Sequence, residues 1–548
     1  MNKVQGIKEQ INWSRKISGV SLIIRDKICL KKGLTLILIG LLIAACSGGG
    51  GVDTTSSTFT DNPGSPVVTM AGGSVRGAGT EILSFKGIPY AKPPVGALRW
   101  TAPVVPDIWT ATRDATNFGL QCIQNGTAPM SEDCLFINVW TPKTALVSAS
   151  KLPVMVWVYG GSFTGGNGNI DGTPVAKAGA VVVSMNYRVS TLGFMAHPQL
   201  SAESADKVSG NYGIQDIAQS LKWVKANIER FGGDPTKVTI WGQSSGASAV
   251  TALMSSPRSA GLFQRAILQS AGAWRHWKTL QTAEQDGLAV GTSIAALRAL
   301  PVAQIPVILN LGGGSAIRAL AEPRVIGPTM DGVILPHQER LAYETGSSTS
   351  VPVIVGNNTD EGFSFTNGYL ISTIAGYKAY LKDPNIYGSF GDIAYGIYPV
   401  NTDADVKSAI SLSFGDNQFW FGMRGIARVY TNSRNMPVYR YYFTRKQNGG
   451  TGSDAVHGNE IPYVFADSKL SSAPYIADDV KISNSMLDAW VRFASTGDPN
   501  GGLITNWPRY NTVTEPVYQF DTTFKVVNGP RNSQLDFVQW FDSSIPAN

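Results

Sequence analysis

Ser244 lies in a five-residue pattern that can expose a serine hydroxyl for nucleophilic attack. The pattern is G-Q-S-S-G at 242–246, and it directly follows the apolar run 238–241. A G-x-S-x-G string after a strand is typical of a nucleophile elbow, a sharp strand-to-helix turn. Glycines suit both ends of this turn, because side chains there would clash with the neighbouring backbone. The pattern predicts a serine nucleophile if the chain also supplies a base, an acid and an oxyanion hole.

The base can be chosen from the order of residues along the chain. A serine hydroxyl is a weak nucleophile and needs a base within hydrogen-bond reach, which an acid orients in turn. In hydrolases that use such an elbow, the order is serine, acid, histidine. The acid is expected just after a late strand, for which the apolar run 351–355 is the best candidate. Of the four histidines, His197, His276, His337 and His457, only the last lies beyond that run.

Two neighbouring carboxylates compete for the role of the acid. The run 351–355 leads into G-N-N-T-D-E-G at 356–362, which contains Asp360 and Glu361. Their spacing from the strand does not separate them, so both remain candidates on the residues alone.

An oxyanion hole needs backbone N–H groups that point at the developing negative charge. Ser245 supplies one, because it follows the nucleophile at a helix N-terminus, where the helix dipole also favours an anion. The other donors should come from a glycine-rich turn after an earlier strand. The string G-G-S at 160–162, directly after the apolar run 154–159, meets that requirement.

The elements that must position these residues alternate between apolar strands and amphipathic helices. A helix is predicted over 214–228, where apolar residues recur at helical spacing. Such alternation predicts an α/β fold with a mostly parallel sheet that helices cover on both faces. The less regular segments 275–320 and 365–430 are expected to form helical excursions over the active-site side, and the Pro/Gly-rich string 85–96 is expected to be a loop. Further strands are predicted at 67–69, 73–76, 180–184 and 266–268.

The positive charge of the chain is confined to its beginning. Residues 1–46 hold eight of the 45 basic residues and two of the 39 acidic ones, which leaves 37 of each in the remainder. Nucleic-acid binding would need a basic face on the folded part, so no such partner is expected.

The first 46 residues are expected to be an export leader. Lys31 and Lys32 precede the apolar run 33–45, which is too short for an ordinary membrane span of about 20 residues. The string I-A-A-C at 43–46 resembles the lipobox of bacterial lipoproteins, which implies lipidation of Cys46 and an outer-membrane lipoprotein; an ordinary cleaved signal peptide is the alternative. We therefore predict a leader at 1–46, a flexible tether at 47–66 and a catalytic domain at 67–548.

Cys122 and Cys134 are the two cysteines that remain after this leader. An exported protein can form disulfides, so the pair is expected to close a short loop. Two free buried thiols are the alternative.

Several long strings resemble the type B carboxylesterase family of α/β-hydrolases. They are the elbow string 231–246, the string E-D-C-L-F-I-N-V at 132–139, and shorter strings that run through nearly all of the chain after the leader. The resemblance implies that Glu361 is the acid, that His457 is the base, and that Gly161, Ser162 and Ser245 donate to the oxyanion. It also suggests that Ser270 and Glu460 support His457 indirectly, through the residues that contact it.

The resemblance implies a serine hydrolase that cleaves carboxylic esters through an acyl-enzyme, with no cofactor and no metal. A lipase or an amidase on the same residues, and a non-catalytic adhesion relative, are the alternatives. The predicted loop 123–133 contains no aromatic residue to hold a quaternary ammonium, which argues against choline esters. The aromatic string 419–421 fits either an acyl pocket or the core.

Overall fold

The computed structural model describes residues 59–149, 151–305, 326–446, 448–450 and 454–544. The predicted leader, the lipidation site Cys46 and the first part of the tether lie outside these residues. In the part of the chain that is described, no helix combines the length and the apolar character that crossing a membrane requires.

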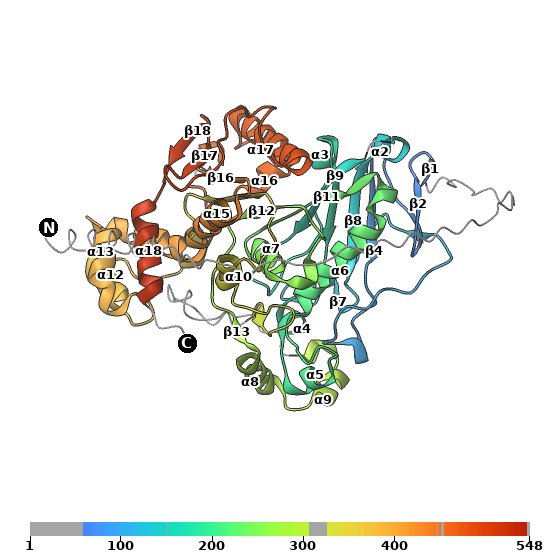
Figure 1. Cartoon of the computed structure of the whole chain (residues 1–548), viewed down its shortest axis with the longest axis horizontal. Coiled ribbons are helices and arrows are strands. Elements are labelled where there is room, and N and C mark those ends of the chain that lie inside the picture. The colour runs from blue at the N-terminus through green and yellow to red at the C-terminus, as the bar shows by residue number, and fades with distance from the viewer. Residues whose placement is uncertain (1–58, 150, 306–325, 447, 451–453, 545–548) are drawn as a thin grey trace, which may run out of the picture. The chain divides into compact units, whose positions relative to one another are not determined.

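A ten-stranded sheet forms the centre of the molecule (Figure 1). In the spatial order given at the end of this paragraph, the neighbouring strands β17, β16, β15, β12, β11, β9 and β10 run parallel to one another. The strands at the two ends of the sheet, β18 on one side and β8 and β4 on the other, pair antiparallel. This architecture confirms the predicted α/β-hydrolase fold with a mostly parallel sheet. In spatial order the strands are β18 (Lys525–Asn528), β17 (Pro516–Phe520), β16 (Val438–Phe443), β15 (Val353–Asn358), β12 (Arg265–Gln269), β11 (Gly233–Gln243), β9 (Leu152–Val158), β10 (Val181–Met185), β8 (Phe136–Pro142) and β4 (Ile82–Pro89).

The middle stretches of the central strands are largely apolar because helices cover the sheet on both faces. Along β9, Val154, Val156 and Val158 belong to one core cluster and Met155 and Trp157 to the other. The first cluster also takes side chains from α6 (Tyr212–Asn227) and α7 (Ser245–Ser255), and the second from α17 (Ala477–Thr496). The predicted helix over 214–228 corresponds to α6.

The folded domain begins earlier than predicted. β1 (Phe59–Thr60) pairs with β2 (Val67–Met70), which pairs with β3 (Gly73–Arg76) in a small separate sheet. Residues 59–66, which we expected in the tether, are therefore part of the fold. Phe59 explains the difference, because its ring packs against the main core cluster.

β4 contradicts the prediction that residues 85–96 form only a loop. Phe85 and Ile88 are buried and pair with β8, and a shift in strand register lies between them. Gly87 has a φ of +70° within this irregular stretch. The bulge breaks the period-2 pattern by which strands are recognised in sequence, so this Pro/Gly-rich stretch did not show a strand pattern.

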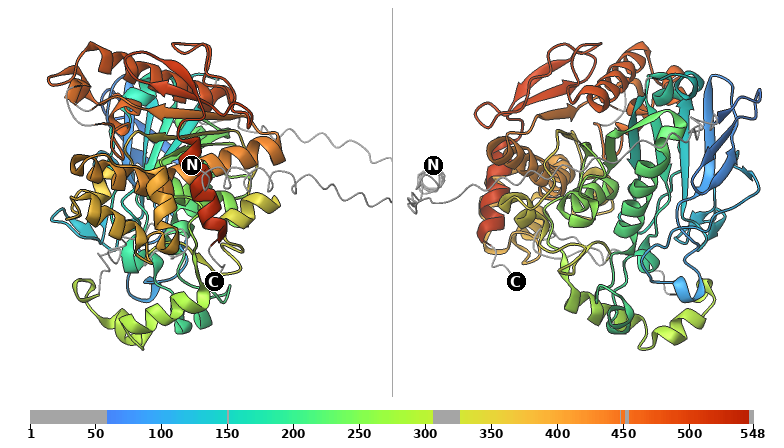
Figure 2. Two further views of the ribbon diagram at one scale, coloured as in Figure 1. Left: turned by 90° about the vertical axis from the view of Figure 1, so that its left-hand side faces the viewer. Right: turned by 45° about the vertical axis from the view of Figure 1, so that its right-hand side comes forward.

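The segments 275–320 and 365–430, which we expected to form helical excursions, are largely helical in their described residues. α8 (Leu280–Val290) and α9 (Ile294–Ala299) lie below the sheet in Figure 1. α12 (Ile374–Lys382), α13 (Gly391–Ile397) and the C-terminal α18 (Asn532–Ser544) gather at the end opposite the N-terminal strands, and Figure 2 shows the same grouping from two other sides. α14 (Val406–Gly415) and α15 (Phe421–Arg434) connect this group to the sheet.

Candidate active site

Ser244 occupies the strained turn between β11 and α7 that the sequence predicts. Its φ and ψ are 58° and −130°, and its N–H donates to Gln269 O over 2.9 Å. A Cβ on Gly246 would lie 2.2 Å from Val158 O, and one on Gly242 would lie 2.7 Å from the Gly246 carbonyl carbon. Both glycines are therefore required by close backbone approach, as the elbow pattern implies.

Three of the non-glycine residues with positive φ lie beyond the carboxyl ends of three adjacent strands. Ser162, Ser244 and Ser270 follow β9, β11 and β12, and their φ values are 59°, 58° and 52°. Residues with side chains rarely adopt positive φ, and when they do they cluster at functional sites. The three serines thus identify one edge of the sheet as the site.

Glu361 and His457 form a direct pair at this edge. Glu361 Oε2 lies 2.6 Å from His457 Nδ1. The other oxygen, Oε1, accepts from Ser270 Oγ over 2.6 Å and from the Asn358 N–H over 2.7 Å. The carboxylate is 1% exposed. Charge-assisted bonds of this kind fix both the tautomer and the orientation of an imidazole.

Asp360, the other candidate for the acid, contacts a serine instead of His457. Its Oδ1 accepts a short hydrogen bond from Ser411 Oγ, and burial raises its pKa. The geometry therefore agrees with the family resemblance in pairing Glu361, rather than Asp360, with His457.

The loop that carries His457 is tied to the segment that carries Glu361. The Asp360 N–H donates to Ala455 O over 2.9 Å, and Asn358 Nδ2 donates to Val456 O over 2.8 Å. The fully buried His197, by contrast, caps α5 (Pro198–Glu203), where its Nδ1 accepts from the Gln199 N–H over 3.1 Å. Of these two histidines, only the one selected by chain order lies at the site.

Gln243 is a residue whose contact the sequence did not reveal. Its side-chain Nε2 lies 3.2 Å from His457 Nε2, the ring nitrogen that faces away from Glu361. Within the described residues, no hydrogen bond joins Ser244 Oγ to His457.

The predicted oxyanion donors surround the elbow. Gly161 and Ser162 have φ values of 124° and 59°, and Ser245 is the first residue of α7. Ser245 Oγ also accepts from the Phe163 N–H over 3.2 Å, which ties the donor loop to the elbow. In the described part of the chain, no protein acceptor takes the N–H of Gly161 or Ser162, so both are available to a ligand.

We expect Gly161→Ala to lower kcat strongly and Ser162→Gly to leave it nearly unchanged. A Cβ on Gly161 would lie 2.3 Å from Gly165 O, so the donor loop must move, and losing one donor typically lowers kcat about 10²–10³-fold. Ser162→Gly keeps the N–H and suits the positive φ, so kcat should change less than about three-fold. Steady-state kinetics on p-nitrophenyl acetate tests the pair, and equal losses in both variants would contradict this assignment.

Ser270 and Glu460 support the site at different distances from His457. Ser270 bonds to Glu361, as described above. Glu460 lies one contact further from the imidazole, because Asn358 Nδ2 and Gln269 Nε2 donate to its carboxylate over 2.6 and 3.1 Å. Its support therefore reaches His457 through Asn358 and Glu361.

Glu460 should make stability depend on pH. Burial, and then the charge of Glu361, raise its pKa above the ordinary 4.5. The folded state then holds a proton that the unfolded state has lost, so stability falls as pH rises from about 4.5 through the raised value. In Glu460→Gln this loss is absent, and the unfolding free energy of the variant relative to wild type should increase between pH 5 and 8. Urea melts across this range, with the exposed Glu229→Gln as control, measure the trend; a constant difference would contradict it.

Two phenylalanine rings pack against His457 from segments far apart in sequence. The ring centroids of Phe419 and Phe365 lie 4.4 and 5.2 Å from the imidazole. Phe419 belongs to a π-helical turn, Asp416–Trp420, between α14 and α15. Phe365 in α11 (Phe363–Thr366) is 37% exposed. The three residues of the string 419–421 therefore have different roles. Phe419 contacts the base, whereas Trp420 and Phe421 belong to the core.

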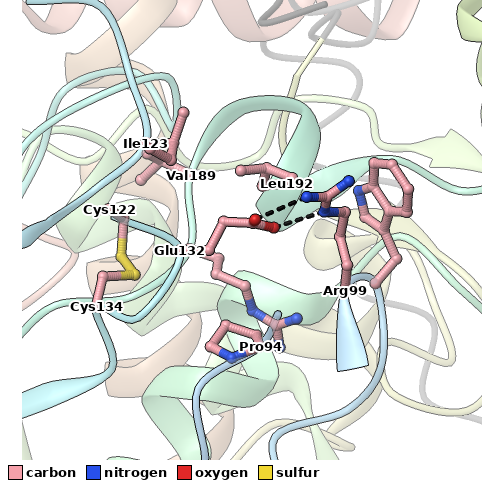
Figure 3. A pocket seen from close by; sticks show the side chains of 10 residues that line it. Pro94, Arg99, Cys122, Ile123, Glu132, Cys134, Val189 and Leu192 are labelled. Atoms are coloured by element: carbon pink, nitrogen blue, oxygen red, sulfur yellow. Dashed lines mark hydrogen bonds and ion pairs between the residues drawn. A yellow bond between two sulfur atoms is a disulfide. The ribbon is translucent and has the colours of Figure 1, made fainter. Parts of the chain in front are cut away.

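The predicted disulfide between Cys122 and Cys134 is confirmed. Figure 3 shows it beside Glu132, whose carboxylate makes two hydrogen bonds to Arg99 of 2.6 and 2.7 Å. The cavity between them has a volume of only about 10 Å³. The disulfide loop is thus held in place by a partly buried ion pair, and the space beside it is too small for an ester.

These features define an α/β-hydrolase with the residues of a serine esterase at the carboxyl edge of its sheet. The chain belongs to the carboxylesterase family, whose model matches residues 64–538. It is 42% identical to the fumonisin B1 esterase of Sphingopyxis macrogoltabida over 80% of this chain and 83% of that one. It is 32% identical to the para-nitrobenzyl esterase of Bacillus subtilis (strain 168), with 85% and 97% covered. A solved PNB esterase structure superimposes with a TM-score of 0.72 at 30% identity, covering 86% and 99%. The protein is a carboxylic ester hydrolase.

Proposed function

We propose that this hydrolase cleaves its esters through an acyl-enzyme on Ser244, with His457 as the base and Glu361 as the acid. The observation that carries the proposal is the 2.6 Å contact between Glu361 Oε2 and His457 Nδ1 beside the serine elbow. This contact places the proton on Nδ1 and leaves the lone pair of Nε2 to accept the proton of the serine.

The reaction follows from these roles. Ser244 Oγ attacks the ester carbonyl while His457 takes its proton, and the N–H groups of Gly161, Ser162 and Ser245 stabilise the oxyanion. His457 then protonates the departing alcohol. Water repeats the attack on the acyl-enzyme and releases the acid.

Pre-steady-state kinetics tests the acyl-enzyme. Mixing with p-nitrophenyl acetate should release a burst of p-nitrophenol equal to the concentration of active sites, provided that deacylation is slower than acylation. A series of acetate esters with different leaving groups but the same deacylation step should then share one kcat. If kcat follows the leaving group throughout and one equivalent of phosphonate fails to inactivate the protein, the acyl-enzyme is contradicted.

The substrate is proposed to carry an apolar group beside the scissile bond. Phe365 and Phe419 present aromatic surface next to His457, and apolar walls favour alkyl or aromatic groups. Activity on p-nitrophenyl esters from acetate to palmitate distinguishes an esterase from a lipase. The highest activity on short acyl chains supports an esterase, and the highest activity on long chains supports a lipase. Because one relative is a fumonisin B1 esterase, that compound belongs in the panel, and anilides test the amidase alternative.

We further propose that residues 1–46 direct export and that Cys46 is lipidated, which would tether the enzyme to the bacterial outer membrane. The support is the I-A-A-C string after a short apolar run. Mass spectrometry of the mature N-terminus should find an acylated Cys46, and Cys46→Ala should release the enzyme from the membrane fraction. A mature chain without acyl groups would favour an ordinary secreted protein.

A further inference from the structure

Among the described residues, the imidazole of His457 has two hydrogen-bond partners, of which one is an acid and the other an amide. Glu361 accepts from Nδ1, and the side-chain Nε2 of Gln243 lies 3.2 Å from the ring's Nε2. Because the proton of the neutral ring is on Nδ1, its Nε2 is an acceptor, and the amide of Gln243 must be the donor. That lone pair is the one that accepts the proton of Ser244 in the proposed mechanism.

Gln243 is held firmly enough to make this contact specific. It is the last residue of β11, it is 5% exposed, and it precedes the nucleophile directly. Gly458, which follows the base with a φ of +85°, passes close to the same amide, since a Cβ there would lie 3.6 Å from Gln243 Nε2. The end of β11 and the histidine loop therefore meet at this side chain.

We propose that Gln243 is a positioning residue that holds the resting imidazole by its Nε2 and, being uncharged, keeps the base unprotonated at working pH. The inference rests on the proposed role of His457. A donor to Nε2 stabilises the neutral ring and disfavours the imidazolium. When a substrate arrives, this weak neutral hydrogen bond is exchanged for the one from Ser244.

The charges around the ring explain why a neutral partner matters here. In the described residues, Glu361 contacts the ring directly, Glu460 lies in the same loop, and Asp360 is in the adjacent segment with Asp454 acting on it. Glu361 is the one of these that contacts the ring, and a carboxylate in contact favours a protonated imidazole; burial raises the pKa of Glu460 and of Asp360, so both carry less charge. A further carboxylate at position 243 would add to this effect, whereas an amide opposes it.

Gln243→Glu tests the proposal with a nearly isosteric change. A carboxylate within about 4 Å of an ionisable group typically shifts its titration by 1–3 pH units. The acid limb of the pH profile of kcat/KM should therefore move upward by at least about one unit. The matched control is Gln264→Glu, because Gln264 Oε1 accepts from the Val238 N–H over 2.9 Å in the middle of β11, five residues before Gln243, and its profile should match the wild type. An unchanged acid limb in Gln243→Glu would overturn the proposal.

A second measurement does not depend on activity. In Ser244→Ala protein labelled with ¹⁵N-histidine, the four histidines can be told apart by comparison with a His457→Gln spectrum. If Gln243 is the donor, His457 Nε2 should keep the chemical shift of a hydrogen-bonded, unprotonated nitrogen after the serine hydroxyl is removed. A shift to the value of a free nitrogen would show that Ser244 was the donor. Full activity in His457→Gln would instead contradict the proposed function, so the two failures are distinguishable.

Discussion

Ser244→Ala is expected to lose at least about 10⁴-fold in kcat on p-nitrophenyl acetate, because removing the nucleophile of such a triad leaves only binding and the oxyanion hole. The Ser244→Ala variant should also fail to react with a fluorophosphonate probe. The strained φ of 58° at this position is equally unfavourable for alanine, so the fold should remain as stable as in the wild type.

The matched control for this variant is Ser255→Ala, at the other end of the same helix. Its hydroxyl donates to Thr251 O over 3.0 Å within α7 and is buried, so its loss should affect stability by about 1 kcal/mol and leave kcat unchanged. Probe labelling that survives in Ser244→Ala would assign the nucleophile to another residue.

Glu361→Gln should lower kcat about 10³–10⁴-fold, whereas Asp360→Asn should lower it less than about five-fold. The amide of glutamine can present a donor to His457 Nδ1 and so favour the wrong tautomer, which is the effect seen when the acid of a triad is replaced by its amide. Asp360 contacts Ser411 instead of the imidazole, so its charge is dispensable for the proton transfer.

Steady-state kinetics for both variants should be accompanied by thermal melts, since both carboxylates are at least partly buried. A large kcat loss in Asp360→Asn together with an active Glu361→Gln would reverse the assignment. Equal losses with lowered melting temperatures would indicate that the whole segment, and not one carboxylate, supports the base.

The sequence predicts the central strands and the elbow well, because residues close together in the chain determine these elements. β9 and the second half of β11 are buried on both faces, so their residues form apolar runs, and the elbow needs glycines at fixed positions. Chain order then leaves His457 as the base. Whether Asp360 or Glu361 meets it depends on how one turn after β15 is bent, which the residues alone leave open.

The parts that could not be predicted depend on contacts between distant segments. β16 was missed because Arg440 interrupts its apolar pattern, yet this guanidinium is fully buried between the rings of Trp420 and Tyr510, at 6.0 and 5.5 Å. The contact of Gln243 with His457 joins residues 214 positions apart. Phe365 and Phe419 likewise meet at His457 from separate helices, and no local pattern links them.

The π-helical turn Asp416–Trp420 makes this site sensitive to the number of residues in the chain, and not only to their types. A π-turn holds one residue more than an α-turn, and that extra residue sets the direction of every side chain in it. Here Phe419 faces His457, and Trp420 donates to Asn358 O over 3.2 Å, whose own N–H holds Glu361. A relative with one residue fewer between α14 and α15 would turn both rings by about 100° and lose these contacts while every other residue matched. The number of residues between α14 and α15 therefore decides whether these two rings reach the site.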